Sequence, residues 1–288
     1  MPKYIEFIGP SAIGKTTVYN FLKTKHTTTD KWIPADKIST DISIRRKLKN
    51  IIKKILNHKT VAGYQNINTK ILERFTENNP GLMEILWQTL PFKQKEINGK
   101  DFRIHSLLIL IRRFIKIQSL KEFDSTKYCI LDEGVLQSIS YFLDKTSSLS
   151  FEERISKLFD NIEMPDGVVF FDGNINVITE RYRLRKKILP HDKNLSVAEF
   201  TESKMRDLEI KRKCCEIISA KKGTPVLHLS GAESIQAKAG KIIAFIDALD
   251  KPDQFKPYPP NKRIGVATIN NLKKVIAPIP FIINLFDL

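Results

Sequence analysis

The amino-acid sequence predicts an α/β protein in which helices cover both faces of a parallel sheet. Short apolar runs that are typical of buried strands alternate along the chain with longer segments of helical periodicity. This alternation favours parallel strands joined by helical crossovers. The chain has 288 residues, of which 42% are hydrophobic, and this is enough for one large domain with a packed core.

Each apolar run has the length of a buried strand and is bounded by polar or turn-forming residues. Strands are expected at Tyr4–Ile8, near Trp32–Ile33, and at Lys127–Leu131, Val168–Asp172 and Val226–Leu229. Apolar residues that recur every three or four positions mark the helices. Helices are expected at about 15–25, 43–59, 70–90, 104–120, 135–144, 151–160, 176–185, 197–220 and 234–249. The stretch 42–125 is therefore mostly helical and lies between two strands.

The composition bears on partners and on location. Lys and Arg number 48 against 32 Asp and Glu, and this net charge of +16 either attracts a polyanionic partner or reflects lysine-rich, solvated faces. The three cysteines provide neither a disulfide framework nor a metal-binding set, which fits a reducing compartment. The residues after Met1 lack a signal-peptide apolar region, and no apolar run reaches about 18 residues. We therefore expect a cytoplasmic protein without a membrane-spanning helix.

The residues from Gly9 to Thr16 match the phosphate-loop pattern G-x-x-x-x-G-K-[ST] without a mismatch. The loop follows an apolar strand and opens a helix, so its backbone N–H groups and the positive end of the helix dipole can surround the phosphates of a nucleoside triphosphate. Lys15 provides a cation for the β- and γ-phosphates, and Thr16 provides a hydroxyl for Mg²⁺. The sequence thus predicts that ATP and Mg²⁺ bind at Gly9, Ser11, Ala12, Ile13, Gly14, Lys15, Thr16 and Thr17.

Acidic residues follow the strands of the predicted sheet, where ligands bind in parallel α/β folds. Asp132, directly after an apolar strand, can hold Mg²⁺, and Glu133 can accept a proton from an attacking hydroxyl. The roles of these two acids are interchangeable. Asp36 follows the expected second strand and is a further candidate for the base that contacts the acceptor. Asp172 ends another strand and has similar access to the phosphates, but it is a weaker candidate for a functional carboxylate.

An arginine-rich segment follows the strand that ends at Asp172. Arg181 and Arg185 are four residues apart and share a helix face, and the polar residues that continue to 196 suit a mobile lid. Lid arginines neutralise the charge that develops on a transferred phosphoryl group, and Arg181 is also expected to contact ATP. The alternative is that these cations interact with the negative end of the helix dipole.

The order of these features resembles the P-loop nucleoside and nucleotide kinases, in particular thymidylate kinases and deoxynucleoside kinases. The resemblance covers about residues 3–249. It implies a three-layer fold with a parallel five-stranded sheet, ATP with Mg²⁺, and phosphoryl transfer to a hydroxyl or a phosphate. It places lid arginines in the stretch from Arg181 to Arg185. It also makes the helical insertion 42–125 the acceptor region, with Arg112 and Arg113 as contacts.

The chain departs from this family at Glu133, where the family usually has an arginine that helps to hold the acceptor. An acidic residue suits deprotonation of a neutral hydroxyl better than contact with an acceptor phosphate. We therefore expect a kinase whose acceptor is a small hydroxyl compound, such as a nucleoside or a sugar. A GTPase is disfavoured because the stretch Asn261-Lys262-Arg263-Ile264 lacks the acid of the N-K-x-D guanine signature.

Two regions outside the phosphate loop leave other functions open. Residues 43–59 form a basic amphipathic stretch, whose charges are either solvated or dock on nucleic acid or on a membrane surface. After the kinase-like domain 1–250, residues 251–288 form a proline-rich basic linker and an apolar tail, which either packs on the domain or contacts a partner or a membrane. The alternatives are a nucleotide-dependent binding protein and, less favoured, a kinase that acts on nucleic-acid ends.

Overall fold

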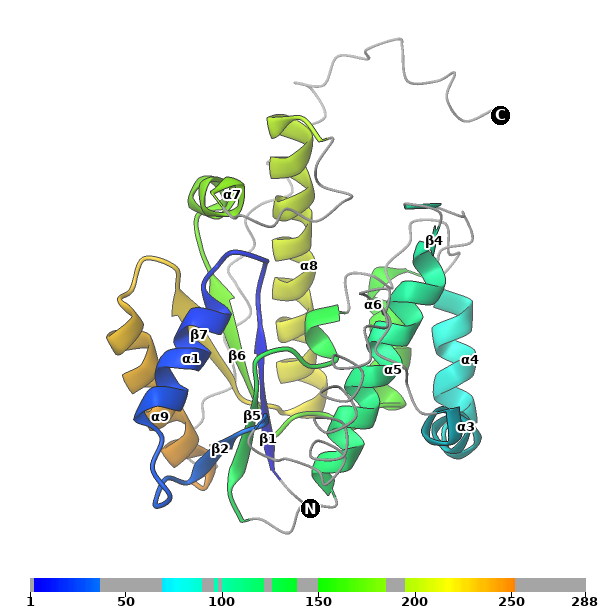
Figure 1. Cartoon of the computed structure of the whole chain (residues 1–288), viewed down its shortest axis with the longest axis horizontal. Helices are drawn as coiled ribbons and strands as arrows, with labels where there is room; N and C mark the ends of the chain where they lie inside the picture. Colours follow the sequence, from blue (N-terminus) through cyan, green and yellow to red (C-terminus); the bar gives the residue numbers. More distant parts are fainter. Residues whose placement is uncertain are drawn as a thin grey trace, which may run out of the picture. The chain divides into compact units, whose positions relative to one another are not determined.

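The structure is a computed structural model of the whole chain, shown in Figure 1. The structure describes residues 3–36, 69–89, 96–97, 100–121, 126–138, 150–184 and 195–251. The chain divides into two units, Met1–Pro257 and Tyr258–Leu288, and all described residues belong to the first. The basic stretch 43–59 and the tail after Lys251 lie outside the described residues, so the domain boundary expected at residue 250 stays a prediction.

Among the described residues, five parallel strands form the main sheet in the order β2-β5-β1-β6-β7. Their bounds are Tyr4–Ile8 (β1), Trp32–Pro34 (β2), Tyr128–Leu131 (β5), Gly167–Asp172 (β6) and Val226–Ser230 (β7). β1 is central, because Ile5 lies opposite Ile130 of β5 on one side and Gly167 of β6 on the other. The three middle strands are almost wholly buried, which explains their near-continuous apolar sequences. The predicted parallel five-stranded sheet is confirmed.

Helices cover both faces of this sheet (Figure 1). One face carries α1 (Lys15–Lys25), α7 (Ile175–Arg183) and α9 (Ile235–Leu249), which share a core with Phe7 and Phe171. The other carries α3 (Thr69–Asn78), α4 (Pro80–Thr89), α5 (Phe102–Lys121), α6 (Phe151–Asp160) and α8 (Val197–Lys222), which share a core with Ile8 and Phe170. Successive strand residues point to opposite faces, so both cores draw on the same strands. The predicted three-layer α/β fold is confirmed.

Local sequence signals set the two ends of α8. The Ser196 side chain accepts a hydrogen bond from the Glu199 backbone N–H at 3.3 Å, and the Ser196 N–H donates to the Glu199 carboxylate at 2.8 Å. This capping box starts the helix directly after the predicted lid. Gly223, with a φ of 66°, ends the helix in a left-handed conformation that suits glycine. Neither α8 nor any other helix in the described ranges combines the length and apolar character of a membrane span.

The predicted helical insertion is confirmed by α3, α4 and α5 where the structure describes it. The insertion also contains a small antiparallel hairpin of β3 (Glu96–Ile97) and β4 (Lys100–Asp101), on either side of the turn expected at Asn98-Gly99. The hairpin was not predicted, because strands of two residues are too short to produce a periodic pattern.

The prediction of a helix at 135–144 is wrong for the part that the structure describes. Residues 136–138 form a 3₁₀ turn just after Gly134, and residues 139–149 lie outside the described residues. The reason is a buried acceptor below the turn: the Gln137 N–H donates at 2.9 Å to the carboxylate of Glu6 in β1. A side chain that accepts backbone N–H groups competes with regular helical bonding.

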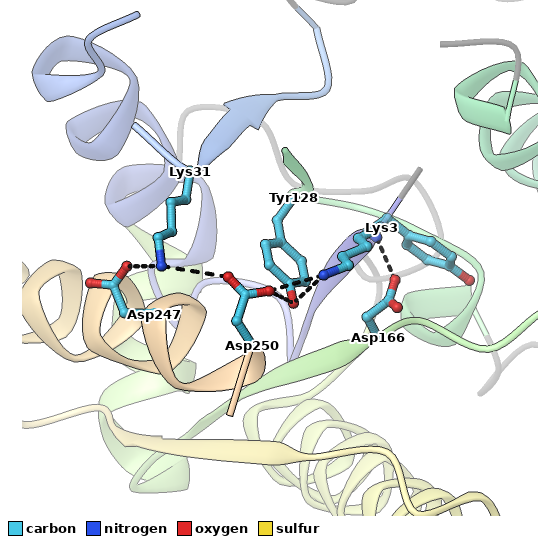
Figure 2. A network of polar contacts seen from close by, with 7 residues as sticks. Lys3, Lys31, Tyr128, Asp166, Asp247 and Asp250 are labelled. Atoms are coloured by element: carbon cyan, nitrogen blue, oxygen red, sulfur yellow. Dashed lines mark hydrogen bonds and ion pairs between the residues drawn. The ribbon is translucent and has the colours of Figure 1, made fainter. Parts of the chain in front are cut away.

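Charged side chains connect the elements at the amino ends of the strands (Figure 2). Lys3 donates to Asp250 at 2.9 Å, and the Tyr128 hydroxyl donates to the same carboxylate at 3.0 Å. Lys31 pairs with Asp247 at 3.7 Å and with Asp250 at 3.5 Å. The end of α9 is thereby connected to β1, to β5 and to the residue before β2.

Candidate functional site

The loop between β1 and α1 has a backbone conformation that restricts its sequence. Gly9 has a φ of 153° and Gly14 a φ of 102°, both in a region that favours glycine. A Cβ on Gly9 would lie 2.7 Å from the carbonyl oxygen of Phe171, so space also requires glycine there. Ala12 has a φ of 70°, which is uncommon for a residue with a side chain. The phosphate-loop sequence therefore folds into a tight, constrained turn.

The two apolar side chains of the loop point into the protein. Ala12 is buried in a small cluster with Tyr182 of α7 and Phe200 of α8. Ile13 is 2% exposed and lies so close to Gly173 that a Cβ added there would come within 2.5 Å of Ile13 Cδ1. Ala12 and Ile13 can therefore offer a ligand only their backbone groups, which is how a phosphate loop binds anions.

Lys15 is buried at the start of α1 and folds back over the loop. Its Nζ donates to the carbonyl oxygen of Gly9 at 2.7 Å and to that of Pro10 at 3.0 Å. Burial, followed by the charge of Lys211, lowers the pKa of Lys15 to about 7, and the charge of Asp132 opposes this change. The ammonium group is thus held by weak neutral acceptors, which the oxygens of an anionic ligand can replace.

Thr16 and Asp132 meet at the carboxyl end of β5. The Thr16 hydroxyl donates to Asp132 Oδ2 at 2.8 Å. Burial raises the pKa of Asp132, and the hydrogen bond from Thr16 opposes this change. The other oxygen, Oδ1, is buried and has no hydrogen-bond partner among the described residues. A hydroxyl next to a carboxylate with an unused oxygen fits Mg²⁺, which takes oxygen ligands and shares them with water and phosphate.

Two further hydroxyls of the predicted phosphate site lie close to Lys15 and Thr16 in the sequence. Ser11 is half-buried within the loop, and Thr17 is exposed in the first turn of α1. Both remain candidates for ATP contacts, because the first turn of a helix presents its N–H groups and short polar side chains to a bound anion.

Glu133 and Arg113, which the sequence suggests for separate roles, form an ion pair. Arg113 of α5 donates to Glu133 Oε2 at 2.9 Å and also to the hydroxyl of Ser138. The Arg113 side chain is 15% exposed, whereas that of Glu133 is 60% exposed. A small molecule can therefore approach Glu133 from solvent, in competition with Arg113. Arg112 is half-buried on the same helix and faces another direction, since consecutive helix residues do not share a face.

Asp36 follows β2 and is held by side chains of α1. It accepts hydrogen bonds from the Tyr19 hydroxyl at 2.8 Å and from Lys23. Burial acts to raise the pKa of Asp36, but the hydrogen bonds from Lys23 and Tyr19 outweigh burial and hold this pKa below its ordinary value. Asp36 is therefore an ionised carboxylate whose two oxygens are already in use.

The structure places Arg181 near α9 and Asp172 near α8. Arg181 is exposed near the end of α7, and its charge acts on Lys238 of α9. Arg185 lies outside the described residues, so its role in a lid stays a prediction. Asp172 accepts hydrogen bonds from Arg212 of α8 at both oxygens, at 2.8 and 3.0 Å. This ion pair joins α8 to the end of β6.

Glu6 and Gln137, which the sequence patterns did not single out, connect β1, the phosphate loop and the turn after β5. Glu6 is fully buried and accepts the Gln137 N–H, while the Gln137 side chain accepts the Gly9 N–H at 3.1 Å. Burial raises the pKa of Glu6 to about 7, against the hydrogen bond from Gln137 and the charge of Arg113. The signal in the sequence was a glutamate within an apolar strand, because a buried carboxylate needs partners.

The solved structures that resemble this chain include two kinases, and both likenesses are weak. No family model matches this chain, and no curated protein matches it. The chain is similar to the structure of a shikimate kinase from Bacteroides thetaiotaomicron, with 15% sequence identity and a TM-score of 0.39, covering 85% of this chain and 98% of that one. It is also similar to a deoxyadenosine kinase from M. mycoides solved with the products dCMP and dCDP, with 11% identity and a TM-score of 0.45, covering 85% of this chain and 99% of that one. The fold class follows from the sheet order and the phosphate loop themselves, and both agree with the predicted resemblance to P-loop kinases.

Proposed function

We propose that this protein is an ATP-dependent phosphotransferase that moves the γ-phosphate of ATP to a hydroxyl group of a small molecule. The observation that carries the proposal is the hydrogen bond of 2.8 Å between Thr16, at the end of the phosphate loop, and Asp132, at the end of the neighbouring strand. A carboxylate beside a bare anion site would repel the ligand. A carboxylate beside a metal-bound triphosphate instead helps to hold the metal.

The described groups of the loop suit the triphosphate. The loop backbone and the start of α1 supply N–H groups, and Lys15 exchanges the carbonyl oxygens of Gly9 and Pro10 for phosphate oxygens. Thr16 and Asp132 would hold Mg²⁺, which when bound neutralises negative charge on the β- and γ-phosphates.

The proposed transfer breaks one bond to the γ-phosphorus and forms another. The bond between the γ-phosphorus and the oxygen that bridges it to the β-phosphate breaks, and a bond forms between the same phosphorus and the acceptor oxygen. ADP leaves with the electron pair of the broken bond, and the hydroxyl proton passes to a carboxylate of the protein. Glu133 is the first candidate for this base because it is exposed at 60% and can exchange Arg113 for the acceptor. Asp36 is the second candidate.

The carboxyl edge of the sheet offers a different environment on each side of β1. Asp132, Glu133 and Asp36 follow β5 and β2 on one side. On the other side, a pocket of about 450 Å³ opens at the ends of β6 and β7, where its lining includes Asn174 and Ser230. In parallel sheets, ligands bind beyond the carboxyl ends of the strands. We therefore place the acceptor on the β2–β5 side and the nucleotide base on the β6–β7 side.

The proposal is tested by nucleotide binding and then by turnover. Calorimetry should detect uptake of ATP with Mg²⁺, weakened when a chelator removes the metal. Release of ADP should then rise on addition of one compound in a panel of nucleosides and sugars, and mass spectrometry should find that compound phosphorylated. An oligonucleotide with a free 5′-hydroxyl serves as the control acceptor.

Three results would change the proposal. No uptake of any nucleoside triphosphate would overturn it altogether. ADP release that responds to the oligonucleotide and not to small compounds would move the acceptor to nucleic-acid ends. Uptake of ATP without turnover in the presence of any acceptor would favour a nucleotide-dependent binding protein.

A further inference from the structure

One side of α8 carries a stripe of buried residues. The stripe includes two lysines in its first part and only cysteines and an isoleucine in its last part. Most of its members are three or four residues apart, with Cys214 and Cys215 adjacent where the buried side widens: Phe200, Lys204, Leu208, Lys211, Cys214, Cys215 and Ile218. The last three pack into the core over the sheet. The helix has 26 residues, or about 39 Å, and extends past the carboxyl ends of the strands (Figure 1). The stripe therefore continues from the core to the edge of the sheet that carries the phosphate loop.

The amino-terminal part of this stripe lies against the phosphate loop. Phe200 packs with Tyr182, with ring centroids 4.6 Å apart, and both contact Ala12 of the loop. The Lys204 ammonium lies 4.7 Å from the centre of the Phe200 ring and 4.9 Å from that of Tyr182. The next charged member of the stripe towards the core is Lys211, two turns along the helix.

Lys211 is buried to a degree that lysines rarely reach unless they are paired. Its side chain is 2% exposed, and its Nζ donates to Asp207 Oδ2 at 2.6 Å. Burial lowers the pKa of Lys211, the charge and hydrogen bond of Asp207 oppose this change, and the charge of Lys204 adds to it. The Asp207 side chain is 21% exposed, so the pair is partly buried, and such a pair is weak evidence for a purely stabilising role.

Lys211 belongs to the same group of charges as the phosphate loop. Its charge acts on Lys15, as do those of Asp207, Asp132 and Glu133. Asp207 supplies one counter-charge near these two buried ammonium groups, and a ligand with several negative charges would supply more. α8 packs on the same face of the sheet as α5, which carries Arg113 opposite Glu133. Lys211 therefore belongs to a helix that lies on the same face of the sheet as α5.

We propose that Lys211 is a second phosphate-binding cation, which contacts the terminal phosphate of a bound nucleoside triphosphate, and that Asp207 holds its side chain in position. This inference rests on the proposed function, because it assumes that the loop binds a triphosphate. The sequence predicts that lid arginines neutralise the charge of the transferred phosphoryl group. In this proposal Lys211 of α8 supplies part of that neutralisation.

The test compares a diphosphate with a triphosphate. Lys211→Met keeps the apolar stem and removes the charge, and calorimetry measures binding of ADP and of the β,γ-imido analogue of ATP, each with Mg²⁺. We expect the affinity for the triphosphate analogue to fall by about 10–100-fold, because a charge-assisted hydrogen bond is lost, while that for ADP changes little. Lys213→Met, at a side chain that is 57% exposed on the same helix, is the matched control.

The outcomes separate this inference from the proposed function. If the wild-type protein binds neither nucleotide, the proposed function fails and the inference fails with it. If the wild-type protein binds both and Lys211→Met binds both equally well, Lys211 is only a structural residue and the proposed function stands. If Lys211→Met does not fold, Asp207→Asn decides: without the carboxylate that positions Lys211, the preference for the triphosphate analogue over ADP should fall several-fold, and an unchanged preference would overturn the inference.

Discussion

The two ends of the sheet use charged residues in opposite ways. At the amino end, Lys3 and Asp250 form an ion pair at 2.9 Å and remain 43% and 38% exposed (Figure 2). At the carboxyl end, Glu6, Lys15 and Lys211 are each less than one-tenth exposed. Exposed pairs keep most of their hydration and gain little from each other. Buried charges lose their hydration and need strong partners.

The pKa values of the paired and buried groups differ in the same way, except that burial also raises the pKa of Asp166 at the amino end. At the amino end, the hydrogen bond between Lys3 and Asp250 raises the pKa of the lysine and lowers that of the aspartate, so both directions favour the charged pair. At the carboxyl end, burial lowers the pKa of Lys15 and raises those of Glu6 and Asp132, so each charged form is disfavoured. Burial is thus the largest cause of the pKa shifts at Lys15, Glu6 and Asp132, whereas the partner's hydrogen bond is the largest cause at Lys3 and Asp250.

The largest expected effect comes from removing the buried cation of the loop. Lys15→Ala should lower kcat by about 10³–10⁵-fold, the range found for a cation that stabilises a transferred phosphoryl group, while circular dichroism shows that the fold persists. Lys3→Ala removes a cation from the amino end and should leave kcat unchanged. Equal losses of activity in the two variants would mean that the two ends do not differ in function.

A smaller loss of activity should distinguish the two candidate bases. Glu133→Gln should slow transfer by about 10²–10⁴-fold with little change in ATP binding, because the amide keeps the shape and cannot accept the proton. Asp36→Asn should have a much weaker effect, because Tyr19 and Lys23 already use the oxygens of Asp36. Single-turnover kinetics measure the transfer step, and the reverse order of effects would make Asp36 the base.

The buried carboxylate of Glu6 should make stability depend on pH. The pKa of Glu6 is raised to about 7 in the folded state, so its contribution to stability is fully present below the unfolded pKa near 4.5 and is lost as pH rises through about 7. Glu6→Gln removes this dependence. Between about pH 4.5 and pH 8, the unfolding free energy of the variant should gain about 2–3 kcal/mol relative to wild type, measured by urea denaturation. A constant difference between the two proteins would show that Glu6 does not titrate in this range.

The smallest effect is expected at the amino end. Asp250→Asn should lower the unfolding free energy by about 1 kcal/mol or less, because the pairs of Asp250 with Lys3 and Lys31 are exposed. The loss should shrink at high salt, which screens exposed charges. Urea denaturation at two salt concentrations measures it, and ATP binding should not change. A loss as large as that at a buried site would contradict the contrast between the two ends.

The parts of the site that follow from local sequence were predictable. The phosphate loop is one contiguous segment, and its glycines have the positive φ values that such a turn requires. The contact between Thr16 and Asp132 joins residues far apart in the chain, but the carboxyl ends of neighbouring parallel strands always meet at one edge. The Mg²⁺ candidates could therefore be chosen from the expected strands alone.

The contacts that depend on which side chains face each other were not predictable. Nothing local indicates that Gln137 lies over Glu6, and this contact accompanies a short turn at the start of the helix expected at 135–144, in the part that the structure describes. Likewise, Lys211 lies in a lysine-rich helix whose pattern suggests solvated charges, and its burial depends on how α8 packs in the fold. Arg113 and Glu133 were each selected, but their pairing depends on where α5 ends up in the fold.

The turn after β5 also constrains how this protein can diverge in evolution. A methyl group at Gly134 would lie 2.3 Å from the Glu6 carboxylate, and Glu6 has no exposed surface into which it could move. A larger residue at 134 is therefore compatible only with a shorter one at 6. In homologous chains these two positions should covary, although 128 residues separate them along the polypeptide (134 minus 6).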